Sequence, residues 1–185
     1  MSGHSKWSTI KHKKAITDAK KSKVFSKIAS LITIAARRGG DPDKNPNLRT
    51  AIEKAREVNL PKENIERAVK RGTGEIAGAQ LEEVTYGAFG PGGAAILITA
   101  ITDNKNRTLA EIKQIFLAHN AKFAEVNSIQ WMFRREGADW LPNSPMKIED
   151  ENAKKELAAL YEALDEQQDV NEIYSTEDEM HLSEE

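Results

Sequence analysis

The hydrophobic pattern changes its period at a glycine-rich stretch, GTGEIAGAQ at residues 72–80. Before this stretch, apolar residues recur every three to four positions, as they do in amphipathic helices. After it, LEEVTYGAF and AAILITAIT carry the β-branched and aromatic residues that are typical of strands. A chain of 185 residues can hold two small domains. We therefore predict a helical bundle at 1–74, a linker at 75–80 and an α+β domain at 81–176.

Apolar residues at helical spacing predict three helices before the glycine-rich stretch. The first lies in KVFSKIASLITIAARRGG, with Arg37–Arg38 in its last turn. The second starts near Asn45, because Asn is a favoured N-cap and a proline follows it. The third spans Pro61–Gly72. Residues 8–22 predict a further helix with a thin apolar face.

The second half predicts a mixed architecture. From residue 94 onwards the patterns indicate strand, helix, strand, strand, helix, strand. In SIQWMFRREG, a strand is indicated because Ile129, Trp131 and Phe133 occupy alternate positions. This order is that of a ferredoxin-like split βαβ sandwich, with helices on one face of the sheet. The fold class is therefore α+β, and the acidic residues 177–185 are expected to form a disordered tail.

Charge is distributed unequally between the halves. Residues 1–74 contain 18 Lys and Arg against 7 Asp and Glu, a net charge of +11. Residues 75–185 contain 9 Lys and Arg against 22 Asp and Glu, a net charge of −13. Such an asymmetry indicates a half that faces nucleic acid. The alternative is that the two halves attract each other.

Several classes of function are disfavoured by composition. The chain has no cysteine, which excludes disulfides and thiolate chemistry, and its four histidines lack the spacing of a metal site. Neither a GxSxG nor a P-loop motif is present. No apolar run is long enough to span a bilayer, and the first arginine is Arg37, unlike in a mitochondrial presequence. We expect a cytoplasmic protein that is not an enzyme. It should need no cofactor or metal, and it should bind neither a membrane nor a small-molecule substrate.

The N-terminal arm, MSGHSKWSTIKHKK, is the first candidate site. Residues 1–30 carry eight lysines against one acid, Asp18. Lysine is a point charge that grips phosphate rather than reading bases, and contacts from half of these lysines give a salt slope of about −3 to −4. Trp7 either stacks on an unpaired base or packs on the bundle. The basic half thus supplies the candidate nucleic-acid-binding residues His4, Lys6, Trp7, Lys11, His12, Lys13, Lys14, Lys20, Lys21, Lys23, Arg37 and Arg38.

Two loops of the second half are further candidates. TDNKNRT at 102–108 joins a strand to a helix N-terminus, a natural place for an anion. Its candidate donors to phosphate are Asn104, Lys105, Asn106 and Arg107, although helix capping with a solvated arginine explains the same residues. The second loop, GPGG at residues 90–93, joins two strands, so a tight turn is favoured over a phosphate loop. Its candidate contacts are Gly90, Pro91, Gly92 and Gly93.

Four ordered motifs resemble the YebC/PmpR family, which includes the mitochondrial translational activator of cytochrome c oxidase subunit I. They are GHSKWSTIKHKK, ARRGGDPDKNPNLRTAIEKA, LPKENIERAVKRGTG and YGAFGPGGAAILITAITDNKNRTLAEI. The resemblance implies a cytoplasmic, non-enzymatic regulator of gene expression. Members are described as DNA-binding transcriptional regulators or as ribosome-associated translation factors, some of which relieve stalling at proline-rich stretches.

The chain departs from the family pattern in one region. Members usually carry a third domain, inserted after the WMF segment. Here that domain is expected to be absent near 137–146, because WMFRREG is followed almost directly by the final helix and strand. The turn YGAFGPGG also differs from the usual YEGYGPGG.

These observations lead to three hypotheses. The first is a translation factor that binds the ribosome through ribosomal RNA, and through tRNA at its loops. The second is a transcriptional regulator at promoter DNA, which needs sequence discrimination of roughly 4–10 kcal/mol from a reading element that the chain does not display. The third is an interaction module whose acidic sheet binds a basic protein.

Overall fold

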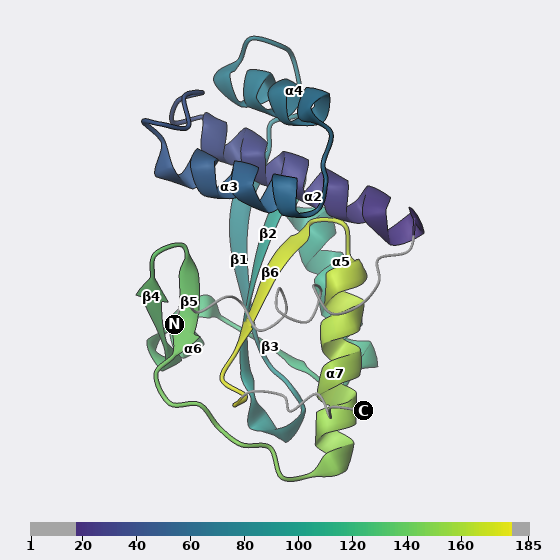
Figure 1. Cartoon of the computed structure of the whole chain (residues 1–185). Coiled ribbons are helices and arrows are strands. Elements are labelled where there is room, and N and C mark those ends of the chain that lie inside the picture. The colour runs from purple at the N-terminus through teal and green to yellow at the C-terminus, as the bar shows by residue number, and fades with distance from the viewer. Residues whose placement is uncertain (1–17, 179–185) are drawn as a thin grey trace. The chain divides into compact units, whose positions relative to one another are not determined.

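The computed structural model describes residues 18–178, which form two compact units. The helical unit contains α2 (Asp18–Ala36), α3 (Pro46–Glu57) and α4 (Lys62–Thr73) (Figure 1). Most of residues 82–178 belong to the second unit, and we call this range, with its strands and remaining helices, the sheet unit. Residues 75–80 are exposed and belong to no helix or strand. The predicted limits, with a linker at 75–80 between two domains, stay a prediction.

In the helical unit, α2 packs against both α3 and α4. Its core is small and aliphatic: Ile32, Ala36, Leu48, Ala51, Ala55, Leu60 and Ala68. The approach of α4 to α2 is close because Gly72 has no side chain, and a Cβ there would lie 2.6 Å from the Ala36 Cβ. The Thr33 hydroxyl joins the same two helices, since it donates to the Ala68 carbonyl at 3.2 Å.

The helix limits confirm one prediction and correct two. Asn45 caps α3, where its Oδ1 accepts from the Leu48 N–H, and its Nδ2 donates to the Ala35 carbonyl at 2.8 Å. Arg37–Arg38 lie just beyond the end of α2 rather than in its last turn. Gly72 does not end α4, because Gly74, at φ +82°, provides the left-handed cap.

The main sheet of the sheet unit has the strand order β3-β1-β2-β6. Its strands are β1 (Glu82–Phe89), β2 (Ala95–Thr102), β3 (Lys122–Ala124) and β6 (Val170–Ser175). The outer strands β3 and β6 run antiparallel to their neighbours β1 and β2. Two helices, α5 (Lys105–Ala118) and α7 (Glu151–Glu166), lie on one side of the sheet (Figure 1). The predictions at β1, β2, β6, α5 and α7 are confirmed, whereas the sequence did not predict β3.

The opposite face of the sheet is covered by residues 126–142. These form α6 (Val126–Ile129), a 3-10 turn η2 (Gln130–Met132), and a hairpin of β4 (Phe133–Glu136) and β5 (Asp139–Pro142). A second core cluster lies beneath them: Ala95, Leu97, Ala124, Ile129, Phe133 and Tyr174. The α+β class, with a helical bundle before a sandwich, is therefore confirmed.

The predicted strand through Ile129, Trp131 and Phe133 is wrong in its first half. Residues 126–132 are helical, and β4 pairs with β5 in a separate two-stranded sheet. Ile129 and Phe133 are both buried whereas Trp131 is 71% exposed. Apolar residues four apart fit a helix as well as a strand. The predicted strand is therefore not part of the main sheet, in which β1 lies between β2 and β3.

The C-terminal segment is held to the fold as far as Asp178. The Met146 N–H donates to the Thr176 carbonyl at 2.7 Å, and the Asp178 N–H donates to the Met146 carbonyl at 2.6 Å. Glu177 is buried and accepts a hydrogen bond from the Tyr161 hydroxyl. The expected disorder is therefore wrong for residues 177–178, and 179–185 lie outside the described residues. Over 18–178, none of the helices has the length and apolarity needed to cross a membrane.

Candidate nucleic-acid interface

The start of α2 presents the described part of the lysine-rich segment. Lys20, Lys21 and Lys23 lie in its first two turns and are exposed. Lys27, which continues the row at helical spacing, is only 7% exposed. The helix expected at 8–22 overlaps α2, which includes residues 18–22. The other candidates of the arm lie outside the described residues: His4, Lys6, Trp7, Lys11, His12, Lys13 and Lys14.

Two arginines follow the other end of α2. Arg37 and Arg38 are exposed, at a position where the helix dipole favours cations. Within residues 18–178, no carboxylate forms an ion pair with either guanidinium. Both planar forks can therefore meet the oxygens of an external phosphate.

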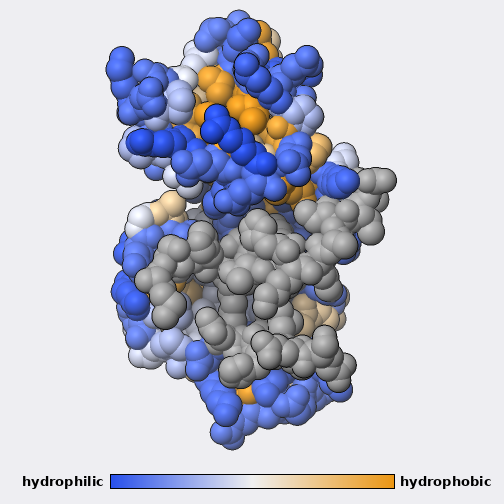
Figure 2. Space-filling model, in the orientation of Figure 1, coloured by the Kyte–Doolittle hydropathy of each residue, from blue (hydrophilic) through white to orange (hydrophobic). Residues whose placement is uncertain are grey.

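The charge asymmetry is present in the described residues themselves. Residues 18–74 contain 14 Lys and Arg against 7 Asp and Glu, a net charge of +7. Residues 82–178 contain 9 against 18, a net charge of −9. Figure 2 shows hydrophobic residues gathered on one face of the helical unit and framed by hydrophilic ones. The helical unit thus combines positive charge with accessible apolar surface.

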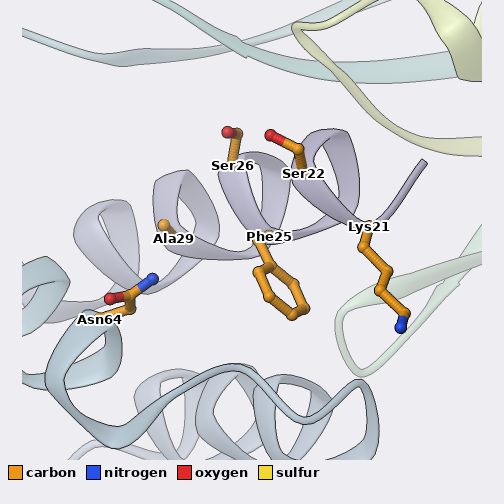
Figure 3. Close-up of a pocket in the computed structure, with 6 residues that line it drawn as sticks. All are labelled: Lys21, Ser22, Phe25, Ser26, Ala29 and Asn64. Atoms are coloured by element: carbon orange, nitrogen blue, oxygen red, sulfur yellow. The ribbon is translucent and has the colours of Figure 1, made fainter. Parts of the chain in front are cut away.

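An open hollow of about 440 Å³ lies between α2 and α4. Phe25 and Lys21 project from the same side of α2, and Asn64 comes from α4 (Figure 3). The lining is completed by Ser22, Ser26 and Ala29. The Phe25 ring and the Lys21 ammonium suit the base and the phosphate of a nucleotide, respectively, whereas the Ser22 and Ser26 side chains point to the other side of α2 (Figure 3).

Sequence reasoning missed most of this hollow. Phe25 was assigned to the apolar stripe of its helix, where it is half-buried against the core. Asn64 lies 39 positions further along the chain, so no local pattern links it to Phe25. Lys21 is the one residue of this lining that the sequence indicated as a candidate.

The loop at 102–108 is tied internally through Arg107. Its Nη2 donates to Asp169 Oδ2 at 3.0 Å, and the Thr108 hydroxyl donates to the same oxygen at 2.7 Å. The Asp169 side chain is only 11% exposed. Burial and the charge of Asp169 raise the pKa of the nearby Tyr86 hydroxyl. The arginine charge is therefore already neutralised within the sheet unit.

The remaining candidates of this loop are exposed. Lys105 forms an ion pair with Glu82, and the Asn104 N–H donates to the Thr102 hydroxyl at 2.9 Å. Asn104, Lys105 and Asn106 are all exposed to solvent. A phosphate here would compete with the carboxylate of Glu82, so the loop is a weaker candidate than α2.

The GPGG segment is the turn that the sequence predicts between two strands. Gly90 and Pro91 are buried, and a Cβ at Gly90 would lie 2.9 Å from the Leu157 Cδ1 of α7. Gly92 and Gly93 are exposed, with φ values of +73° and +83°. The N–H groups of Gly90 and Gly93 are bonded within the turn. Only the tip is therefore open to a ligand.

No described cluster points to metal chemistry. Over residues 18–178, no group of three His, Cys, Asp or Glu side chains is placed to hold an ion. What the helical unit offers instead is a surface for an anion and a flat ring.

Two family models match the chain in order. The model of the TACO1/YebC N-terminal domain matches residues 5–75, and that of the TACO1/YebC second and third domain matches 81–138. The second match stops at the turn between β4 and β5. The absence of the family's third domain near 137–146 stays a prediction.

Curated relatives match over most of this chain. A protein of Dictyoglomus turgidum is 49% identical over 95% of the chain and 71% of its own length. One of Desulfosudis oleivorans is 56% identical, over 74% of the chain and 56% of its own length. Both are named "Probable transcriptional regulatory protein". The chain thus spans between about half and three quarters of the relatives it matches.

A solved structure has the same fold. The crystal structure of a conserved hypothetical protein, Aq1575, from Aquifex aeolicus superposes with a TM-score of 0.82 at 31% sequence identity. The match covers 93% of this chain and 96% of that one. Sequence, relatives and fold agree, and this chain belongs to the TACO1/YebC family.

Proposed function

We propose that this protein is a non-enzymatic regulator of gene expression that binds the ribosome through RNA and acts in translation. The observation that carries the proposal is the segregation of charge, +7 on the described helical unit against −9 on the sheet unit. In this proposal the lysines of α2, with Arg37–Arg38 beyond its other end, bind the phosphates of the RNA. No residue has a catalytic role.

The hollow between α2 and α4 favours RNA over duplex DNA. Phe25 offers a ring face only to a base that has left its stack, and Lys21 lies beside it. Ribosomal RNA supplies such bases in its loops and bulges, whereas the bases of duplex DNA are stacked and paired. Assistance at proline-rich stalls belongs to this proposal as the finer expectation from the family resemblance.

Binding to promoter DNA is the second candidate. It is favoured by the names of the relatives, which are probable transcriptional regulatory proteins. Against it, the exposed basic residues near the start of α2 are lysines, which bind phosphate without a bidentate fork for base edges. Sequence-specific binding would have to come from recognition of the shape of the DNA or from the protein residues before position 18.

Cosedimentation with ribosomes at near-physiological salt tests the proposal. The variant Lys20→Glu, Lys21→Glu, Lys23→Glu reverses three exposed charges near the start of α2, where acidic side chains are compatible with the helix. The matched control, Lys122→Glu, Lys147→Glu, Lys155→Glu, reverses three exposed charges of the sheet unit.

We expect the first variant to lose at least about tenfold in ribosome affinity and the control to bind nearly as wild type. Wild-type protein that ignores ribosomes, yet shifts a promoter fragment more than a scrambled one, would reverse the choice between the two candidates.

A further inference from the structure

Trp131 is the most conspicuous surface feature of the sheet unit. Its side chain lies on η2 and is 71% exposed. Its Nε1–H donates to the Ser128 carbonyl at 2.8 Å. The one polar atom of the indole is therefore satisfied internally, and the rest of the ring is carbon. Trp is enriched at binding interfaces, because it combines a large apolar surface with one polar atom.

The backbone beneath the indole is held in place. The Asn143 amide donates to the Trp131 carbonyl at 2.8 Å, and the Asn143 N–H donates to the Met132 carbonyl at 2.8 Å. Met132 packs against the core cluster on this face of the sheet. A ring fixed by its own hydrogen bond and by a braced backbone loses little conformational freedom when a ligand stacks on it.

Two arginines follow Trp131 closely in sequence, in an otherwise acidic unit. Two of the three arginines of residues 82–178, Arg134 and Arg135, follow Trp131 on β4 and are exposed. Arg134 donates to the Pro142 carbonyl at 2.8 Å, next to Asn143. Arg135 lies over the Trp140 ring, 4.5 Å from its centroid. Both guanidiniums are positioned and keep further N–H donors.

We propose that Trp131 and Arg134 form a second RNA contact, at which one unpaired base stacks on the indole and the guanidinium meets an adjoining phosphate. This rests on the proposed function, which places RNA on the protein. The net charge of −9 on the sheet unit opposes a long phosphate backbone, so the contact takes a single splayed nucleotide rather than a duplex.

Titration of the full chain with two fluorescent RNAs tests this contact. One probe is a short single-stranded oligoadenylate and the other is an RNA duplex of equal length, both at near-physiological salt. The variants are Trp131→Ala, Trp131→Phe and Arg134→Ala. The control is Leu117→Ala, which truncates a side chain of the same unit that is 83% exposed.

Trp131→Ala should weaken single-strand binding about 5- to 100-fold, the range of one base–aromatic stack, and leave duplex binding unchanged. Trp131→Phe should retain most of the affinity, Arg134→Ala should lose part of it, and Leu117→Ala should lose none. Because the indole is exposed, its removal leaves no cavity, and an unchanged unfolding temperature is expected for every variant.

Three results would contradict the contact. Single-strand binding equal to wild type in Trp131→Ala, with binding lost in the α2 lysine variant, overturns it and leaves the proposed function standing; a peptide-binding role for the ring gives this result. Equal losses for both probes also overturn it. Wild-type protein that binds neither RNA overturns this contact, whereas the proposed function is judged separately by cosedimentation with ribosomes.

Discussion

Asp169 holds Arg107 at 3.0 Å across 62 positions of sequence, and so joins the start of α5 to the start of β6. Gln167 approaches the same carboxylate, with its Nε2 at 3.4 Å. The sequence predicts Arg107 as a hydrogen-bond donor to phosphate. In the structure its guanidinium instead links two segments of the sheet unit.

Replacing Asp169 by Asn should lower the free energy of unfolding by about 1–3 kcal/mol, because the Arg107 guanidinium and the Thr108 hydroxyl lose a charged acceptor. Urea denaturation followed by circular dichroism measures the loss. The control is Glu125→Gln, at an exposed position of the same unit. RNA affinity should not change; a gain in affinity would mean that the tie masks a phosphate contact.

The contact of α4 with α2 makes a second prediction. Gly72→Ala places a Cβ against the Thr33 carbonyl oxygen and the Ala36 Cβ, in a region of tightly packed backbone. Such overpacking typically costs about 1–3 kcal/mol. Gly78→Ala is the control, because its Cβ would meet nothing closer than 3.4 Å. Similar unfolding temperatures for the two variants would show that the helices can separate without cost.

Stability at alkaline pH should depend on Tyr161. Burial, together with the charge of Glu177, raises the pKa of its hydroxyl well above the ordinary value of 10.0. The unfolded chain then releases this proton at lower pH than the folded protein does. Stability is unaffected below pH 10 and falls above it, by up to about 1.4 kcal/mol per pH unit for this group.

Urea denaturation between pH 8 and roughly 11 measures this slope. Tyr161→Phe should be less stable at pH 8, since Glu177 loses a hydrogen-bond donor, but its stability should fall less steeply above pH 10. The two proteins differ in this one titratable group, so the difference between their curves reports on Tyr161. Parallel curves for the two proteins would contradict the assignment.

Salt dependence should report on Arg37 and Arg38. If each guanidinium binds one phosphate, replacing both by Ala should reduce the slope of log affinity for single-stranded RNA against log salt by about 1.4. Stability should be unchanged, because both side chains are exposed. Titrations across a series of salt concentrations give the slope, and a slope equal to that of wild type would remove the pair from the interface.

Local features of the fold were predictable from sequence, and long-range pairings were not. Asn45 could be assigned as a cap because its signal lies within three residues of it. Gly72 was misassigned because its role depends on how closely α2 approaches, which no local pattern states. Trp131 was misassigned because Ile129 and Phe133 satisfy the spacing of a helix and of a strand alike.

The candidate site divides in the same way. Net charge and the lysines of α2 are visible in composition, so the basic half was predictable. The hollow requires Asn64 to meet Phe25 across two helices, and the tie of Arg107 requires Asp169. Each depends on residues that are adjacent only after folding.

The β4–β5 hairpin fixes the separation of its own ends. Its register runs from Phe133 opposite Pro142 to Glu136 opposite Asp139, so only Gly137 and Ala138 close the turn. Adding residues between two ends that are already side by side costs loop-closure entropy that grows only slowly with length. A long insertion at this turn, even a folded domain whose two ends lie close together, is therefore expected to cost the hairpin little.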